Sequence, residues 1–386
     1  MTYDFDTVLD RRNTGSLKYD FARARGKPEG LLPLWVADMD FAAPPEVLED
    51  IHSAVSHGIF GYTEPLPDYY GAVIRWFGDR FGLNLMPEEI LPSPGVVFSL
   101  AQAVRAFTRP GDGVLIQTPV YYPFFEIIRD NRRRVAANPL LYENGRYRID
   151  FDDLERQAAR PDVTLFLLCS PHNPVGRVWT AEELTRLRDI CQRHGVLVAA
   201  DEIHGDFIYP GGRFTSFGTL DKRAILCTAP TKAFNLAGLQ SANIFVRDEA
   251  LRRKLRQETA RSGYSQLNVI GLTACRSAYE KGGPWLTALN GYLHGNLRLL
   301  RDFLAARLPQ VRLVEPEGTY LLWLDFSALA LPQAELDRRI TEGAGLWLDS
   351  GTMFGPEGTG FQRINIACPR SLLAEALSRL EQEFSQ

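Results

Sequence analysis

The amino-acid sequence predicts an α/β fold with two domains, and two observations support this prediction. Short apolar runs alternate with helical patterns through the middle of the chain, as strands and helices do in α/β proteins. The composition is typical of a globular protein, with 45% hydrophobic and 23% charged residues, and 386 residues are enough for two separate cores.

The expected strands are short runs rich in Val, Ile, Leu or Phe, which is typical of strands covered by helices on both faces. They lie at 114–117, 163–169, 196–200, 224–228 and 243–246. The clearest helix between them spans Thr180 to about His194. Glu183 follows Thr180 by three positions, which forms a capping box, and Gly195 is placed to end the helix.

The pattern changes at about Pro284. A long helical pattern extends from there through Arg307, and strands are expected near 320–325 and 363–367, before a closing helix. We therefore expect a large domain over residues 46–283 and a smaller α+β domain over residues 284–386. The N-terminal segment, residues 1–45, is expected to join the smaller domain.

Charge and cysteine content argue against several classes of protein. The formal net charge is −4 and no stripe of Lys and Arg is interleaved with aromatic residues, so neither a nucleic acid nor a membrane is an expected partner. The five cysteines are scattered and never in Cys-x-x-Cys spacing, which predicts neither a disulfide framework nor a metal site. The charged N-terminus lacks the apolar core of a signal peptide. A cytoplasmic location is the expectation.

Three short motifs carry side chains of complementary chemistry. Lys232 lies in a Thr-Ala-Pro-Thr-Lys run, Asn173 in a His-Asn-Pro turn, and Asp201 begins an Asp-Glu-Ile-His tetrad. Pyridoxal phosphate needs a lysine amine for a Schiff base with its aldehyde and a carboxylate to keep its ring nitrogen protonated. A surface lysine, a capping aspartate and a turn asparagine are the ordinary alternatives for each residue alone. Their combination predicts a pyridoxal phosphate site.

The three residues have separate expected roles at that site. Lys232 would bind the cofactor and, once displaced by the substrate's amine, take the Cα proton as general base. Asp201 would hold the charge on the ring nitrogen, and Asn173 would hydrogen-bond the cofactor's phenolic oxygen. Asn173 and Asp201 each follow a predicted strand, so both are expected at the crevice where open α/β sheets place their ligands.

Further residues are candidates for holding the cofactor's phosphate and ring. The run at Gly95, Val96 and Val97 precedes a helical pattern, and free backbone N–H groups at a helix start attract a phosphate. Thr228 and Thr231 offer hydroxyl groups near the lysine for the same phosphate. Tyr121 has a ring that could stack on the pyridine, with a core or surface tyrosine as the alternative.

Arg363 lies in an apolar strand pattern and has a planar guanidinium suited to a carboxylate. An amino-acid substrate supplies such a carboxylate. The segment from Trp35 to Phe41 is expected to shape the pocket for the substrate's side chain.

At this point the chain is similar to a known class of enzymes. Over essentially its full length it resembles the fold-type I pyridoxal phosphate enzymes, by Asn173-Pro174, Asp201, Lys232 and Arg363. Longer sequence segments resemble those of the MalY/PatB branch, the cystathionine β-lyases or C–S lyases. These segments are residues 34–41, 60–63, 201–204, 235–240 and 316–320. The resemblance implies a large domain with a mostly parallel, seven-stranded sheet and a smaller C-terminal α+β domain.

The resemblance also implies a reaction and an assembly. The reaction is α,β-elimination of cystathionine or a related S-substituted cysteine to pyruvate, ammonia and a thiol. The assembly is a homodimer with shared active sites, in which Tyr62 reaches the partner's cofactor phosphate. His204 and Gln240 stand where the aspartate aminotransferases have a tyrosine and a phosphate-binding arginine, as is usual in the lyase branch. Ala229 replaces a hydroxyl residue of the aspartate aminotransferases, so the phosphate is expected to be bound differently here.

Two alternatives stay open. The first is an aminotransferase on the same scaffold, because fold does not choose between elimination and transamination. The second is a regulatory or partner-binding protein that has lost catalysis, which the presence of Lys232, Asp201, Asn173 and Arg363 disfavours. The sequence does not identify the thiol that leaves.

Overall fold

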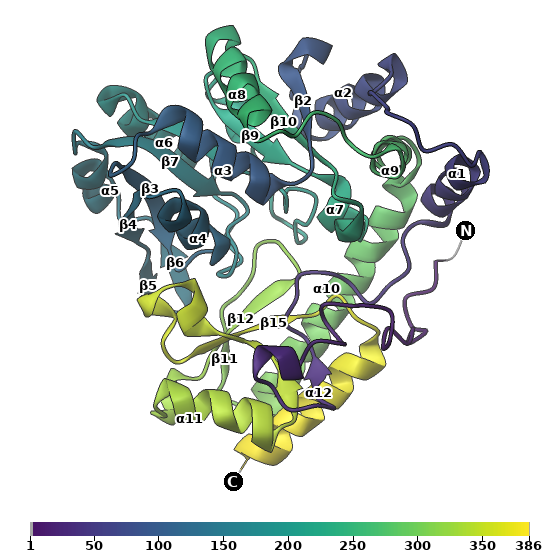
Figure 1. Ribbon diagram of the computed structural model, residues 1–386. Coiled ribbons are helices and arrows are strands. Elements are labelled where there is room, and N and C mark those ends of the chain that lie inside the picture. The colour runs from purple at the N-terminus through teal and green to yellow at the C-terminus, as the bar shows by residue number, and fades with distance from the viewer. Residues whose placement is uncertain (1–2, 386) are drawn as a thin grey trace.

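A seven-stranded sheet forms the centre of the larger part of the molecule in the computed structural model, which describes residues 3–385 (Figure 1). The strand order is β2-β10-β9-β8-β7-β3-β4. Neighbours from β9 to β4 are parallel, whereas β10 is antiparallel to both of its neighbours. The strands are β2 (Ile90–Ser93), β3 (Gly113–Thr118), β4 (Arg134–Pro139), β7 (Val163–Cys169), β8 (Leu197–Asp201), β9 (Ile225–Thr228) and β10 (Ala242–Val246).

The five expected strands are all present, and their ends differ by at most one residue from the prediction. The apolar runs are continuous because both faces of the sheet are covered. Leu165 and Leu167 pack into one hydrophobic cluster, whereas Phe166 and Leu168 between them pack into the other, as the alternation of side chains along a strand requires. The prediction of a mostly parallel α/β sheet is therefore confirmed.

Helices cover the two faces of this sheet. α3 (Val96–Phe107), α4 (Pro123–Asp130) and α8 (Glu249–Arg261) contribute to one cluster, and α5 (Phe151–Ala158) and α6 (Ala181–His194) to the other. The capping box predicted for α6 is present, since Thr180 Oγ1 accepts from Glu183 N at 3.1 Å and Thr180 N donates to Glu183 Oε2 at 2.8 Å. Gly195 ends the helix in the left-handed region, with φ +71°.

A second sheet lies in the C-terminal part of the chain. Its order is β11-β12-β15-β14, all pairs antiparallel. The elements are β11 (Arg312–Leu313), β12 (Leu321–Asp325), β14 (Asp349–Ser350) and β15 (Phe361–Asn365), with the helices α10 (Gly283–Arg307), α11 (Gln333–Arg338) and α12 (Arg370–Phe384). The long helix expected from Pro284 to Arg307 is confirmed as α10.

The N-terminal segment lies against this second sheet region (Figure 1). β1 (Leu32–Pro33) pairs in parallel with β13 (Leu346–Trp347), and Asn365 N donates to Leu34 O at 2.8 Å. The predicted domain boundaries, at residues 45 and 283, stay a prediction.

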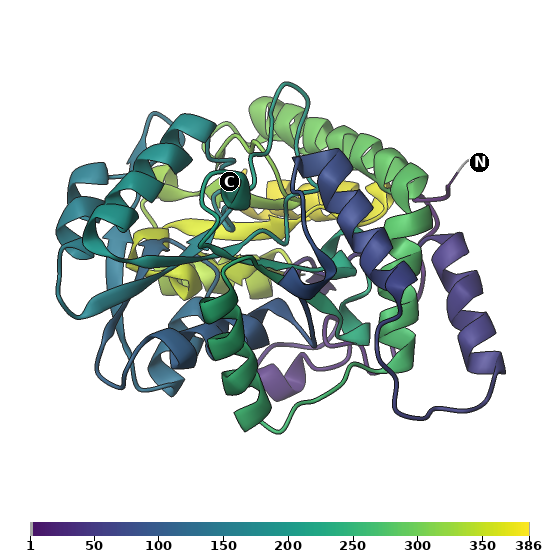
Figure 2. The ribbon, with the colours of Figure 1, turned by 90° about the horizontal axis from the view of Figure 1, so that it is seen from above.

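The remaining helices are α1 (Pro45–Ser56), α2 (Pro67–Phe81), α7 (Pro230–Ala233) and α9 (Val269–Lys281), and a short hairpin is formed by β5 (Leu141–Glu143) and β6 (Arg146–Arg148). Figure 2 shows the loop between α1 and α2 running along the outside of the molecule. Across residues 3–385, no helix combines the length and the apolar character that a membrane span needs.

The connectivity places a crevice at one edge of the large sheet. From β3 the chain continues outward to β4, whereas β7, β8 and β9 follow one another on the other side of β3. Ligands of open α/β sheets bind at the carboxyl ends of the strands where the order reverses in this way. Tyr121, Asn173 and Asp201 follow or end β3, β7 and β8, so the fold brings them to the same crevice.

Candidate active site

A cavity of about 450 Å³ lies at this crevice. Nine of the predicted site residues line it: Gly95, Val96, Val97, Tyr121, Asn173, Asp201, His204, Thr231 and Lys232. A larger cleft of about 850 Å³ lies elsewhere, over residues 209–213 and 315–317, and contains none of the predicted residues. Within the described chain, no group of three His, Cys, Asp or Glu side chains is arranged to hold a metal ion.

Lys232 lies on the single turn of α7, which follows β9 directly. Its Nζ donates to the carbonyl oxygen of Ala37 at 2.8 Å. Burial lowers the pKa of Lys232 to about 8, opposed by the negative charges of Asp38 and Asp201. The amine is therefore far easier to deprotonate than a surface lysine.

Asp201 is the last residue of β8 and is almost fully buried. Its only side-chain hydrogen bond within residues 3–385 comes from Ile203 N, at 3.1 Å. Burial raises the pKa of Asp201 to about 7. A buried carboxylate with so few donors fits a cationic partner, such as the protonated nitrogen of a pyridine ring, which would stabilise its ionised form.

The start of α3 forms the opposite end of the cavity. Ser99 N is the first amide of the helix to bond within it, to Gly95 O at 3.1 Å, so the amides of residues 96–98 are free. A Cβ at Gly95 would meet no atom within 4 Å, so the space beside the start of the helix is open. The arrangement fits a phosphate group.

The two predicted threonines differ in position. Thr231 lines the cavity, as does Gln240. Thr228 does not, because it is buried at the end of β9 and its hydroxyl donates to Asn243 O at 2.9 Å. Of the two hydroxyl groups suggested for the phosphate, the structure brings only that of Thr231 to the site.

Tyr121 and Asn173 are tied together through the backbone, since Tyr121 N donates to Asn173 O at 3.1 Å. This bond joins the loops that follow β3 and β7. Burial raises the pKa of the Tyr121 phenol, so the ring is neutral at physiological pH.

Arg363 lies on β15 and does not itself line the cavity, but it hydrogen-bonds to Asn173, which does. Its Nη1 donates to Asn173 Oδ1 at 3.0 Å and its Nη2 donates to Trp35 O at 2.9 Å. It also forms a buried ion pair with Asp349. Arg363 Nε is buried and finds no acceptor among residues 3–385, so one donor of the guanidinium is unused.

Asp349 was not expected from the sequence. It lies within the apolar Gly-Leu-Trp-Leu-Asp run, and a buried acid in such a run needs a cationic partner. That signal was present, but nothing in the sequence alone pairs position 349 with position 363.

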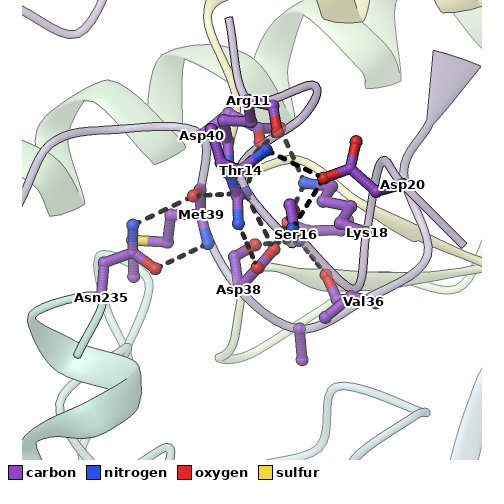
Figure 3. Close-up of polar contacts among 12 residues, drawn as sticks. Arg11, Thr14, Ser16, Lys18, Asp20, Val36, Asp38, Met39, Asp40 and Asn235 are labelled. Atoms are coloured by element: carbon purple, nitrogen blue, oxygen red, sulfur yellow. Dashed lines mark hydrogen bonds and ion pairs between the residues drawn. The ribbon is translucent and has the colours of Figure 1, made fainter. Parts of the chain in front are cut away.

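Residues 35–41 form a strap beside the cavity, which Ala37 lines. Asn235 fixes it by accepting from Met39 N at 2.9 Å and donating to Met39 O at 3.0 Å and Phe41 O at 2.8 Å. Figure 3 shows this contact beside a cluster of charged side chains. The carbonyl oxygen of Ala37, which accepts the hydrogen bond from Lys232 Nζ, also accepts one from Tyr320 Oη at 3.0 Å.

Charged residues from the N-terminal segment hold the strap from the other side (Figure 3). Lys18 is fully buried and donates to Asp40 at 2.6 Å, and Arg11 pairs with Asp38 and Asp40 at 2.6 and 2.8 Å. Trp35, predicted to contact the substrate, stacks its ring on Trp347 and does not line the cavity. Its contribution to the site in this structure is the carbonyl group that accepts from Arg363.

Tyr62 lies outside the cavity, on the loop between α1 and α2, and the residue is 97% exposed. Ile59, Phe60 and Leu66 on the same loop are also exposed. The predicted role of Tyr62 at a partner's site stays a prediction.

Comparisons with known proteins agree with the geometry. The family model for aminotransferase class I and II matches residues 30–380. The chain is 43% identical to cystathionine beta-lyase PatB of Bacillus subtilis, over 99% of this chain and 100% of that protein. Cystalysin from Treponema denticola, whose crystal structure contains pyridoxal 5′-phosphate, superposes with a TM-score of 0.97 at 37% identity, covering 100% of this chain and 99% of that one. The pyridoxal phosphate-bound C–S lyase from Staphylococcus hominis gives a TM-score of 0.93 at 33% identity, covering 100% of this chain and 99% of that one.

Proposed function

The chain belongs to the aminotransferase class I and II family, and we propose on this premise that it is a pyridoxal phosphate-dependent carbon–sulfur β-lyase. Its substrate is cystathionine or a related S-substituted cysteine, which it converts to pyruvate, ammonia and a thiol. The observation that carries the proposal is the buried pair of Lys232 and Asp201 in one cavity with the free amides of α3. The cystathionine β-lyase and C–S lyase relatives give the reaction class.

Each end of the cavity has a defined task toward the cofactor. When bound, pyridoxal phosphate supplies an electron sink for the charge left at the substrate's Cα. Asp201 holds a proton on the ring nitrogen, because its buried carboxylate is stabilised by a positive charge there. The amides at the start of α3 bind the phosphate, and Thr231 and Gln240 lie close enough to the cavity to add side-chain donors.

Lys232 moves the proton. With a pKa of about 8, roughly a tenth of its amine is unprotonated at pH 7, so Nζ can accept the Cα proton without a large energetic cost. The Ala37 carbonyl holds Nζ at 2.8 Å in this structure and so limits where the amine can lie.

Arg363 binds the substrate's carboxylate. Its guanidinium is already fixed by Asn173, Trp35 and Asp349, and its Nε has no acceptor of its own. A carboxylate that approaches from the cavity therefore meets a pre-oriented donor.

The alternative is an aminotransferase on the same scaffold. Lys232 is the one cationic side chain among the described residues that line the cavity, and Arg363 is the one arginine that hydrogen-bonds to any of them. No further arginine is therefore placed to hold a second carboxylate. This observation disfavours a transaminase for dicarboxylic amino acids and favours an uncharged or extended sulfur-linked side chain.

One pair of assays tests the proposal. The purified enzyme loaded with pyridoxal phosphate is mixed with cystathionine, and separately with an amino acid and 2-oxoglutarate. We expect stoichiometric pyruvate and thiol from the first mixture. Glutamate from the second, with no pyruvate from the first, would contradict the proposal. A panel of S-substituted cysteines, assayed for pyruvate, then identifies the preferred leaving group.

We further infer a homodimer in which Tyr62 of one subunit serves the cofactor phosphate of the other. The exposed apolar loop supports this inference, because Ile59, Phe60 and Leu66 are each more than half exposed and such clusters mark contact surfaces. Light scattering of the purified protein and the cofactor affinity of Tyr62→Ala test it. A monomer with unchanged affinity would contradict it. We place the enzyme in the cytoplasm, since all five cysteines are buried and unpaired.

A further inference from the structure

Residues 316–319 connect the smaller sheet to two loops that carry cavity residues. Glu317 N and Gly318 N donate to Gly176 O at 2.8 and 3.1 Å, three residues after Asn173, and Thr319 N donates to Phe207 O at 2.9 Å, three residues after His204. A Cβ at Gly318 would lie 2.5 Å from Phe207 O. The segment therefore packs against the loops of Asn173 and His204 with no room to shift.

Thr319 has an unusual backbone conformation in this segment. Its φ is +65°, a region that β-branched residues rarely adopt, and it is almost fully buried. Strained residues of this kind persist where their surroundings fix them, and they concentrate at functional sites. Thr319 is followed by Tyr320, whose Oη contacts the same Ala37 carbonyl as Lys232.

The hydroxyl of Thr319 has two partners. Leu321 N donates to Oγ1 at 3.3 Å, and Oγ1 lies 3.3 Å from Nδ1 of His204. Leu321 N is a donor, so the single proton of the hydroxyl is left for His204. If His204 carried its own proton on Nδ1, the buried hydroxyl proton would find no other acceptor among residues 3–385, which is costly.

We propose that Thr319 is a positioning residue that fixes the tautomer of His204, so that the ring presents Nε2–H to the cavity as a hydrogen-bond donor. The proposal rests on the proposed function, because the acceptor would be the phenolic oxygen of bound pyridoxal phosphate. His204 lines the cavity, and its Nε2 makes no hydrogen bond within the described chain. The ring packs in a tilted arrangement against Phe207 and edge-on against Tyr320, at 6.3 and 5.8 Å between centroids.

The surroundings of His204 keep its ring neutral. Burial lowers the pKa of His204 to about 3, with the nearby cations Lys232 and Arg363 adding to the effect, so the ring is neutral and the position of its one proton matters. The Thr319 hydroxyl fixes that position by donating to the lone pair of Nδ1, which leaves the proton on Nε2.

Two variants that differ only in the hydroxyl test the proposal. Thr319→Ser and Thr319→Ala both remove the β-branch, so neither adds strain at a positive φ. The cofactor-free proteins are labelled with ¹⁵N-histidine, and the ring nitrogens of His204 are identified by their absence from the spectrum of His204→Gln. We expect a proton on Nε2 in the wild type and in Thr319→Ser. In Thr319→Ala we expect the Nδ1–H share to rise on the order of tenfold.

Two results would overturn the proposal. One is a wild-type His204 with its proton on Nδ1, which is measurable even if neither variant folds. The other is identical ring signals for the serine and alanine variants. Because these measurements need no cofactor or substrate, they stand apart from the lyase assay. In the loaded enzyme, Thr319→Ala is further expected to lower kcat with little change in KM, and Thr319→Ser to restore it.

Discussion

The charged side chains on the two sides of the cavity differ in how many partners they have. On the sheet side, Asp201 and Lys232 each make one side-chain hydrogen bond, and burial moves the pKa of both toward neutrality. On the strap side, Arg363 has three partners. The strap is itself held by Asn235, Arg11 and Lys18.

This difference indicates that the sheet side exchanges protons and that the strap side orients the substrate. On the sheet side, Asp201 and Lys232 have few partners until the cofactor binds, which leaves both groups free to exchange protons. On the strap side, Arg363 is held by three partners before any ligand arrives and only its Nε is left without one, which lowers the entropy lost when a substrate is oriented.

The largest effect is expected at Asp201. Asp201→Asn removes the charge that keeps the ring nitrogen protonated, so kcat/KM for β-elimination should fall by about 10³-fold. Glu202→Gln is the matched control, since Glu202 is equally buried but faces Ser216 and Phe217 instead of the cavity. It should stay within about twofold of the wild type. Equal losses in both variants would mean that burial alone, and not contact with the cofactor, explains the effect.

The next effect concerns the stability of the strap. Lys18→Met leaves Asp40 buried without its closest cation, and the free energy of unfolding should fall by about 3–5 kcal/mol. Denaturation in urea measures this change. Arg12→Met is the control, because Arg12 and Asp10 form an exposed pair in the same segment, and it should be indistinguishable from the wild type. The double variant Lys18→Met, Asp40→Leu should recover much of the lost free energy of unfolding. If it does not, the unpaired Asp40 carboxylate is not the cause of the loss.

The third prediction is a pH dependence of the cofactor-free protein. The folded-state pKa of Asp201 is about 7 and that of Glu202 is about 8, both above the values of 3.8 and 4.5 for exposed groups. The folded state therefore keeps carboxyl protons that the unfolded state releases. Below about pH 6.5 this effect is opposed by His172 and His204, because burial lowers their pKa to about 4 and about 3, so stability should fall as pH rises from about 6.5 to about 8. Chemical denaturation between pH 6.5 and 8 measures the slope.

The cofactor distinguishes the two carboxyl groups. A cationic ring nitrogen should remove the part of the slope that is due to Asp201, and Glu202, on the other face, should keep its part. In the cofactor-free protein, Asp201→Asn and Glu202→Gln should each flatten the slope. A stability that rises with pH over this range would show that the buried carboxyl groups are ionised in the folded state.

The smallest effect separates the two threonines near the phosphate end. Thr231→Val should weaken cofactor binding by about tenfold, as expected for the loss of one hydrogen bond to a charged group. Thr228→Val should change cofactor affinity by less than about twofold, since its hydroxyl bonds to Asn243 O instead. Titration of the cofactor-free proteins with pyridoxal phosphate gives both values. The reverse order would place the phosphate nearer to Thr228.

Much of the fold could be predicted because its signals are local. The capping box at Thr180 and the apolar runs of β7 and β8 depend on residues close in sequence. The edge strand β4 gave no such signal, because Arg134–Pro139 has one face only partly covered and carries polar residues. Asp201 and Lys232 could be predicted because Asp201 ends a buried strand and Lys232 lies four residues after the end of another.

The rest of the site depends on contacts between distant positions. The Ala37 carbonyl acts through the backbone, so its residue type carries no information about Lys232. The pairs Arg363–Asp349 and Thr319–His204 join separate elements, and only the folded chain shows which partners meet. For Trp35, the residue type indicated an aromatic wall, but the backbone directs the ring to Trp347.

The most direct test of the account is the location of the covalent bond to the cofactor. The loaded enzyme is reduced with borohydride and digested, and the modified peptide is identified by mass spectrometry. We expect the pyridoxyl group on Lys232 alone, and no modified peptide from Lys232→Ala treated in the same way. A modified lysine at any other position, or an unchanged yield from Lys232→Ala, would contradict the account.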